Sequence, residues 1–187
     1  MGVVKATTDL RFEHVGVARM LGIMDAMAGR ARRGEHVDLD DLQQVIEFLR
    51  VFVDTRHHTK EEELLFPAIG AANMTSTEPT VAILLEEHAR GRATVARIQA
   101  SLRGLAVPDE AALAELADAL TAYTQLLREH VRREEDDCFG PADRELPAAV
   151  QEELKEGYER VEREVVGGGV HEAFHALLER LGDVYAE

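Results

Sequence analysis

The feature that most restricts the fold of this 187-residue chain is a short segment that occurs twice. The first copy contains His57-x-x-x-Glu61 and the second contains His130-x-x-x-Glu134. In both copies a phenylalanine follows the histidine by nine residues. On an α-helix, side chains four residues apart lie on one face, a single turn from each other. Each histidine–glutamate pair can therefore hold one metal ion or two adjacent ions.

Apolar residues recur with the helical period in four long segments, and each segment carries a metal-binding residue type within its apolar stripe. The first helix is expected to begin near Thr7 and the second to begin after Asp38, which is a typical N-terminal cap. We expect Gly140 and Pro141 to end the fourth helix. The four predicted helices cover approximately residues 7–34, 38–70, 80–104 and 109–140.

The two halves of the chain align as an internal repeat. His57 follows His14 by 43 positions, and His130 follows His88 by 42. Two related helical hairpins joined by short connections favour a four-helix bundle in the up-down-up-down order. The four histidines and two glutamates would then converge on one point in the interior.

The predicted fold class is therefore all-α, and a single domain suffices for this length. The bundle is expected over residues 1–146, as pseudo-repeats at 8–70 and 80–142. Residues 147–187 are expected to add one or two helices. This C-terminal extension would pack along the bundle or against a second subunit in a homodimer.

Charge and cysteine content exclude several classes of protein. The formal net charge of −15 would repel nucleic acid and anionic lipid. A single cysteine, Cys138, cannot form an internal disulfide or a zinc ribbon, and it is expected to be a buried, inert thiol. The start of the chain has no apolar signal core, and no apolar run reaches the length of a membrane span. We therefore expect a cytoplasmic protein without a membrane or nucleic-acid partner.

The doubled motif resembles the hemerythrin-like, HHE cation-binding domains, in which a histidine is followed by H-x-x-x-E and the pattern then recurs. The resemblance covers roughly residues 8 to 146. It implies a four-helix bundle around a non-haem di-iron centre with bridging glutamates. The ligands implied here are His14, His57, Glu61, His88, His130 and Glu134.

The ligand types support a two-metal site independently of the resemblance. Imidazole and carboxylate groups suit iron, manganese or zinc, whereas calcium and magnesium prefer oxygen ligands almost alone. Six ligands exceed what one tetrahedral zinc ion uses. A ferritin-type site would need Glu-x-x-His twice, and this spacing occurs only at Glu172 and His175. Two iron ions bridged by carboxylates and an oxo or hydroxo group are the preferred cofactor, and zinc or manganese would also fit.

The oxygen-carrying hemerythrins that this chain resembles use five histidines and two carboxylates, so one ligand is missing from the predicted set. Tyr123 is one candidate replacement, and a core tyrosine is the alternative interpretation. His58 is another, but it lies about 100° from His57 on an α-helix, which favours an outer or surface position. Fewer protein ligands leave positions for small molecules, which favours reaction with O2 or hydrogen peroxide. The alternative function is a non-catalytic protein that binds or senses O2, NO or iron.

For the other acidic and histidine residues the sequence indicates less specific roles. The acids next to the predicted ligands are expected to form a solvated face or to point sideways, although one could orient a histidine. His171 and His175 could form a weaker metal site with Glu179. Packing or surface positions are the simpler interpretation for these two histidines. The acids next to the ligands are Glu13, Glu62, Glu63, Glu87, Glu129, Glu135 and Asp136.

Overall fold

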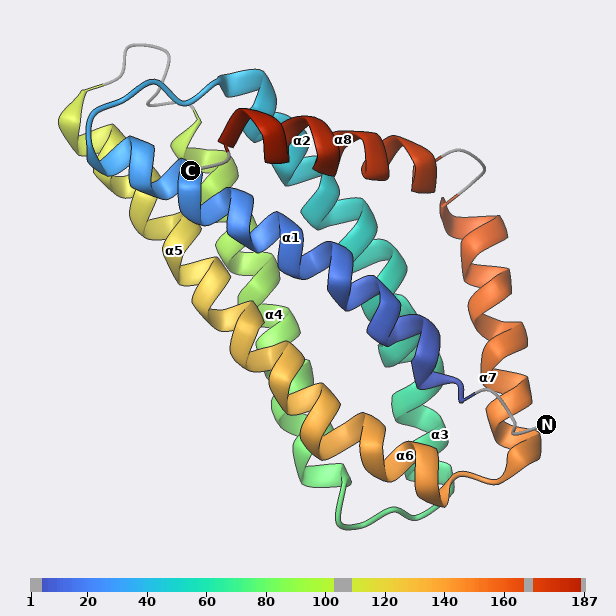
Figure 1. Cartoon of the computed structure of the whole chain (residues 1–187). Coiled ribbons are helices and arrows are strands. Elements are labelled where there is room, and N and C mark those ends of the chain that lie inside the picture. Colours follow the sequence, from blue (N-terminus) through green and yellow to red (C-terminus); the bar gives the residue numbers. More distant parts are fainter. Residues whose placement is uncertain (1–4, 103–108, 167–169, 186–187) are drawn as a thin grey trace.

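The computed structural model describes residues 5–102, 109–166 and 170–185, without the side chains of 165–166 and 170–171. Within these ranges all regular structure is helical and no strand is formed. Four long helical segments run alternately up and down and form a bundle (Figure 1). The predicted all-α bundle with additional C-terminal helices is confirmed. The four segments are α1 (Thr7–Arg32), α2 (Leu39–Phe48) continued by the π-helix η1 (Leu49–His58), α4 (Glu78–Ser101) and α5 (Glu110–Arg133).

Local sequence signals set the ends of these helices. The Asp38 carboxylate accepts hydrogen bonds from the backbone N–H groups of Asp40 and Asp41, at 2.8 and 3.1 Å, and caps α2 as predicted. Asp109 caps α5 in the same way through the N–H of Ala112. Gly34 follows α1 with a φ of 69°, a left-handed conformation that favours glycine.

Each copy of the repeated motif leads into a π-helical segment that is followed by a short α-helix. In the first half these are η2 (Glu61–Leu65) and α3 (Phe66–Ala71), and in the second half η4 (Glu134–Phe139) and α6 (Gly140–Glu145). The predicted stop at Gly140 and Pro141 is wrong, because the helix continues to Glu145. Pro141 lies where the π-helix η4 passes into α6, and the helical backbone continues through it.

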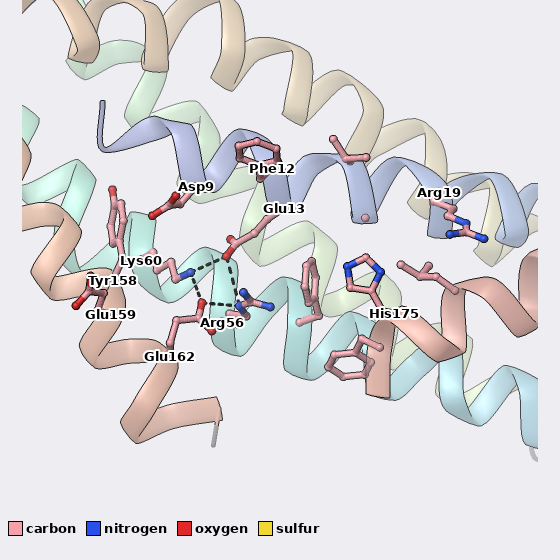
Figure 2. Close-up of a pocket in the computed structure, with 15 residues that line it drawn as sticks. Asp9, Phe12, Glu13, Arg19, Arg56, Lys60, Tyr158, Glu159, Glu162 and His175 are labelled. Carbon is pink, nitrogen blue, oxygen red and sulfur yellow. Dashed lines mark hydrogen bonds and ion pairs between the residues drawn. The ribbon is translucent and has the colours of Figure 1, made fainter. Parts of the chain in front are cut away.

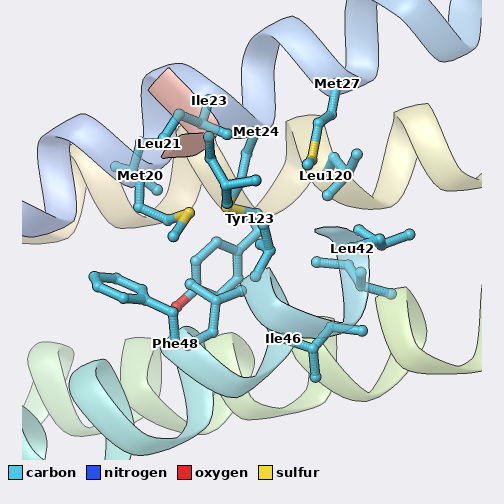
Figure 3. Close-up of a cluster of buried hydrophobic side chains, with 14 of the residues drawn as sticks. Met20, Leu21, Ile23, Met24, Met27, Leu42, Ile46, Phe48, Leu120 and Tyr123 are labelled. Carbon is cyan, nitrogen blue, oxygen red and sulfur yellow. The ribbon is translucent and has the colours of Figure 1, made fainter. Parts of the chain in front are cut away.

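Two apolar clusters fill the bundle on either side of a polar layer. On α1, Leu10 belongs to one cluster and Val17 to the other, with His14 between them. On α4, Leu84 and Val95 lie on either side of His88 in the same way. Figure 3 shows part of the larger cluster, where methionines of α1 face aromatic and aliphatic side chains of α2 and α5. The polar layer is thus enclosed by hydrophobic packing.

The C-terminal extension consists of α7 (Ala148–Val161), the π-helix η5 (Glu162–Val166) and α8 (Val170–Tyr185). Helix α7 packs against η2, η5 packs against η1, and α8 lies across α1 and α2 (Figure 1). Asp41 of α2 joins α8 through Arg180, at 2.7 Å, and through the hydroxyl of Tyr185, at 3.1 Å. The extension therefore packs on the bundle itself. No helix among the described residues is long and apolar enough to cross a membrane.

Candidate metal centre

Seven metal-binding side chains converge in the polar layer of the bundle. They form two groups that share Glu61, and within each group the potential ligand atoms lie within 4.8 Å of one another. Each of the seven side chains is at most 4% exposed. The structure thus brings together all six residues that the sequence predicted, and it adds His58. The groups are His14, His57, Glu61 and Glu134, and His58, Glu61, His88 and His130.

The first group is built by α1, η1 and the two repeated motifs. The Nε2 atoms of His14 and His57 face each other at 3.2 Å. His14 Nε2 lies 3.1 Å from Glu134 Oε2, and His57 Nε2 lies 3.6 Å from Glu61 Oε1. Two imidazoles and two carboxylate oxygens therefore point into one small space.

The second group presents the other oxygen of each carboxylate to a further set of imidazoles. The Nε2 atoms of His88 and His130 are 3.1 Å apart. His130 Nε2 lies 2.7 Å from Glu134 Oε1, and His88 Nε2 lies 3.4 Å from Glu61 Oε2. Since each carboxylate has one oxygen near either group, both glutamates are placed to bridge two metal ions.

His58 is the residue that sequence reasoning placed wrongly. It is 4% exposed, and its ring stacks on that of His88 with 3.8 Å between the centroids. It ends the π-helix η1, in which each residue rotates by less than the roughly 100° of an α-helix. His57 and His58 can therefore both turn towards the interior, each to a different group. The sequence offered one weak signal, Asp54, which lies four residues before His58 and contacts its Nδ1 at 3.4 Å.

The Nδ1 atom of each of the five histidines contacts a carboxylate on the side away from the centre. Except for Asp54, these acids are next to the ligands in sequence, yet each of those four supports a histidine on another helix. Glu13 precedes His14 but lies 2.8 Å from the Nδ1 of His57. Burial acts to raise the pKa of Glu13, but His57 and Lys60 lower it to about 2. The remaining pairs are Glu135 with His14 at 2.9 Å, Asp54 with His58 at 3.4 Å, Glu62 with His88 at 2.7 Å, and Glu87 with His130 at 3.0 Å.

These outer carboxylates fix the tautomer of the histidines. An ionised carboxylate only accepts hydrogen bonds, so each Nδ1–H donates outwards and each Nε2 directs a lone pair to the centre. Glu62 and Glu135 are part-exposed, and each orients a histidine, the alternative considered for one of these acids. Glu13 and Glu87, which were expected to point sideways, contact histidines of other helices. Their contacts depend on how the helices pack, which the helical period of the sequence does not specify.

Several buried polar atoms at the centre have no hydrogen-bond partner among the described residues, and metal dications could serve as their partners. Both carboxylate oxygens of Glu61 and of Glu134, and Nε2 of His58, have no hydrogen-bond partner among the described residues. Burial and the nearby Glu134 carboxylate raise the pKa of Glu61 well above its usual range. Burial acts to lower the pKa of His130, but Glu134 and Glu87 raise it to about 9, so its metal-free imidazole holds a second proton that metal binding would displace. Two metal ions would compensate both carboxylates and accept the converging lone pairs.

Three other predicted candidates lie outside the two groups. Tyr123 is 2% exposed and packs in the apolar cluster shown in Figure 3, so it has the core position considered as the alternative. Cys138 is fully buried in the smaller cluster, and burial raises the pKa of its thiol. His175 is exposed on α8, while the side chain of His171 lies outside the described residues, so the second site stays a prediction.

Fold and centre together define a class of protein: a helix bundle whose interior offers histidines and shared glutamates to two metal ions. The family model described as "Hemerythrin HHE cation binding domain" matches residues 5–141. The chain therefore belongs to the hemerythrin HHE cation-binding domain family, as the motif resemblance indicated.

Mycobacterial proteins resemble this chain over almost its whole length. The uncharacterized proteins Rv1995 of Mycobacterium tuberculosis and Mb2018 of Mycobacterium bovis are each 26% identical to it over 182 residues. The aligned region covers 97% of this chain and 69% of each relative, so it includes most of the C-terminal extension. No solved structure matches the chain significantly.

Proposed function

We propose that this protein holds two iron ions between the five histidines and two glutamates of this centre and reacts with O2 or hydrogen peroxide. One observation carries the proposal. Each of two groups of imidazole nitrogens lies near one oxygen of Glu61 and one oxygen of Glu134, and both glutamates are buried. Nitrogen and oxygen ligands of this kind suit iron, and iron would supply redox chemistry between its ferrous and ferric states. The surrounding apolar clusters would exclude bulk water from that chemistry.

The two groups differ in how many protein atoms they offer. The first contains two histidines, His14 and His57, whereas the second contains three. The ion in the first group would therefore have more positions open to a small molecule, and open positions are typical of reactive metal sites. We assign the binding of O2, peroxide or NO to this first group.

A second candidate function is supported by His58. Sequence reasoning favoured reactivity because one histidine was missing, but His58 brings the available set to five histidines and two carboxylates. This set equals the one expected of the oxygen-carrying hemerythrins that the motif resembles. Reversible, non-catalytic binding of O2 or NO is therefore a direct competitor, and an enzymatic role needs its own test.

The experiment begins with metal analysis of protein expressed in iron-replete medium, where we expect about two irons per chain. The ferrous protein is then exposed separately to O2 and to hydrogen peroxide, with Glu134→Gln as the control that weakens both groups. Turnover of peroxide, with O2 release above the rate of the control, supports the reactive function. An absorption spectrum that forms with O2 and disappears on deoxygenation, without peroxide turnover, supports carriage or sensing. Little metal, or one zinc per chain, would refute the di-iron proposal.

A further inference from the structure

The C-terminal extension reaches the metal centre through a group of four charged residues, drawn in Figure 2. Glu162 of η5 forms ion pairs with Arg56, at 2.6 Å, and with Lys60. Both cations also contact Glu13, Lys60 at 2.5 Å and Arg56 at 3.3 Å. Glu13 in turn holds Nδ1 of His57. A continuous series of polar contacts therefore joins the extension to a histidine of the first group.

Burial makes these contacts consequential. Lys60 is 2% exposed, Arg56 8% and Glu13 6%, so the charges are largely removed from water. A buried charge is costly unless an opposite charge compensates it. Lys60 and Arg56 both contact Glu13, and Glu162 supplies a further negative charge to each of them. Without Glu162, both cations would compete for the carboxylate that orients His57.

The second half of the bundle provides an internal comparison. Lys60 follows His57 by three residues, and Arg133 follows His130 by three. Arg133 pairs with Glu87, which holds Nδ1 of His130. In the part of the chain that the structure describes, Glu87 is the only acid paired with Arg133, whose side chain is 22% exposed. The extension thus adds a carboxylate to one of two equivalent places.

The extension also forms one side of an open pocket beside these charges. A cavity of about 710 Å³ lies between the bundle and the extension, and Glu13, Lys60 and Glu162 form part of its wall. Its remaining wall includes Phe52 of η1 and Phe174 of α8. Glu162 therefore lies at the interface between the bundle and the extension, and its contacts depend on how the extension packs.

We propose that Glu162 is a positioning residue for the metal ion held by His14 and His57, acting through Lys60, Arg56 and Glu13. The inference rests on the proposed two-metal function and deepens it. Docking of η5 keeps Glu13 on His57, so retention of metal in the first group depends on the extension. Retention of metal in the second group does not depend on it. The extension thereby makes the two metal positions unequal in how firmly they hold their ions.

The test compares Glu162→Gln with Glu159→Gln in the full chain loaded with two irons. Glu159 is the matched control, because it lines the same cavity but its side chain is 73% exposed and pairs only with Arg163 among the described residues, at 3.6 Å. Release of iron to a chelator is followed over time. We expect Glu162→Gln to accelerate release of one of the two irons about 3–10-fold, less than the ~10–100-fold typical of residues that touch a ligand directly. Glu159→Gln should match the wild type.

Double variants assign the effect to the proposed contacts. Glu13→Gln should accelerate the same iron as Glu162→Gln, and their combined effect should be smaller than the product of the single effects. Glu87→Gln should accelerate the other iron and combine multiplicatively with Glu162→Gln. Circular dichroism and the unfolding midpoint of the metal-free variants test whether they fold. Glu162→Asp keeps the negative charge, so it should retain iron better than Glu162→Gln.

Three outcomes would overturn the inference. Release from Glu162→Gln could equal that from Glu159→Gln, both irons could be accelerated equally, or the Glu13 and Glu162 effects could multiply. A wild-type protein that never holds two metals would instead refute the proposed function. Wild-type protein with two irons and an unaffected Glu162→Gln variant would refute only the positioning role.

Discussion

Replacing His58 with leucine should weaken metal binding while leaving the metal-free bundle about as stable as before. In the metal-free fold, Nε2 of His58 is buried without a hydrogen-bond partner among the described residues. Such a group costs roughly 1–3 kcal/mol, and leucine removes that cost. Leucine also loses the stacking on His88, worth about 0.5–1.5 kcal/mol, and the long 3.4 Å contact to Asp54. With about 0.5–1.5 kcal/mol for the Asp54 contact, these opposing effects leave a net change in the free energy of unfolding within about 2 kcal/mol of zero.

Metal binding, unlike the stability of the metal-free fold, should change in one definite direction. His58 supplies one of three histidines in the second group, and losing even an outer partner of a ligand typically lowers metal affinity ~10–100-fold. We therefore expect His58→Leu to lower the affinity of one metal position by at least about tenfold, which corresponds to roughly 1.4 kcal/mol. The other position should keep its affinity.

Denaturant unfolding with a chelator and with added metal measures both effects on the same variants. His36→Leu is the control, because His36 is exposed in the α1–α2 connection and belongs to neither group. Retention of two metals with wild-type affinity by His58→Leu would refute the assignment of His58 as a ligand. A loss of more than about 2 kcal/mol in the metal-free protein would show that His58 has a structural role that the reasoning missed.

Three further predictions test the buried groups. Removing metal with a chelator should lower the free energy of unfolding, by ~2.7 kcal/mol relative to metal at 100 times its dissociation constant, and calorimetry measures this. Burial raises the pKa of Tyr123, Tyr158 and Tyr185, that of Tyr185 to about 12, so native protein should show no phenolate absorbance near pH 10. Above pH 10 the unfolded chain loses phenolic protons that the folded chain keeps, so stability should fall as the pH rises, and unfolding at stepped pH checks the sign. The Cys138 thiol should react with a disulfide reagent only after unfolding, and fast reaction of native protein would contradict its burial.

Local sequence patterns determined the bundle and much of its centre. Helical periodicity placed His14, His57, His88 and His130 in apolar stripes, and the i, i+4 spacing placed a glutamate beside two of them. Capping by Asp38 and the glycine after α1 depend on contacts within a few residues, and these were predictable for the same reason. Where the relevant physics is local, residue spacing alone was sufficient.

Only the tertiary structure decided which side chains complete and support the centre. His58 faces inwards because a π-helical segment changes the rotation between neighbouring residues, and the α-helical period cannot reveal this. Glu13 supports His57 on another helix rather than its neighbour His14, because the packing of α1 against η1 sets that contact. Glu162 reaches Lys60 across 102 positions of sequence, through the docking of η5. Such contacts depend on the relative placement of distant helices, which no spacing along the chain encodes.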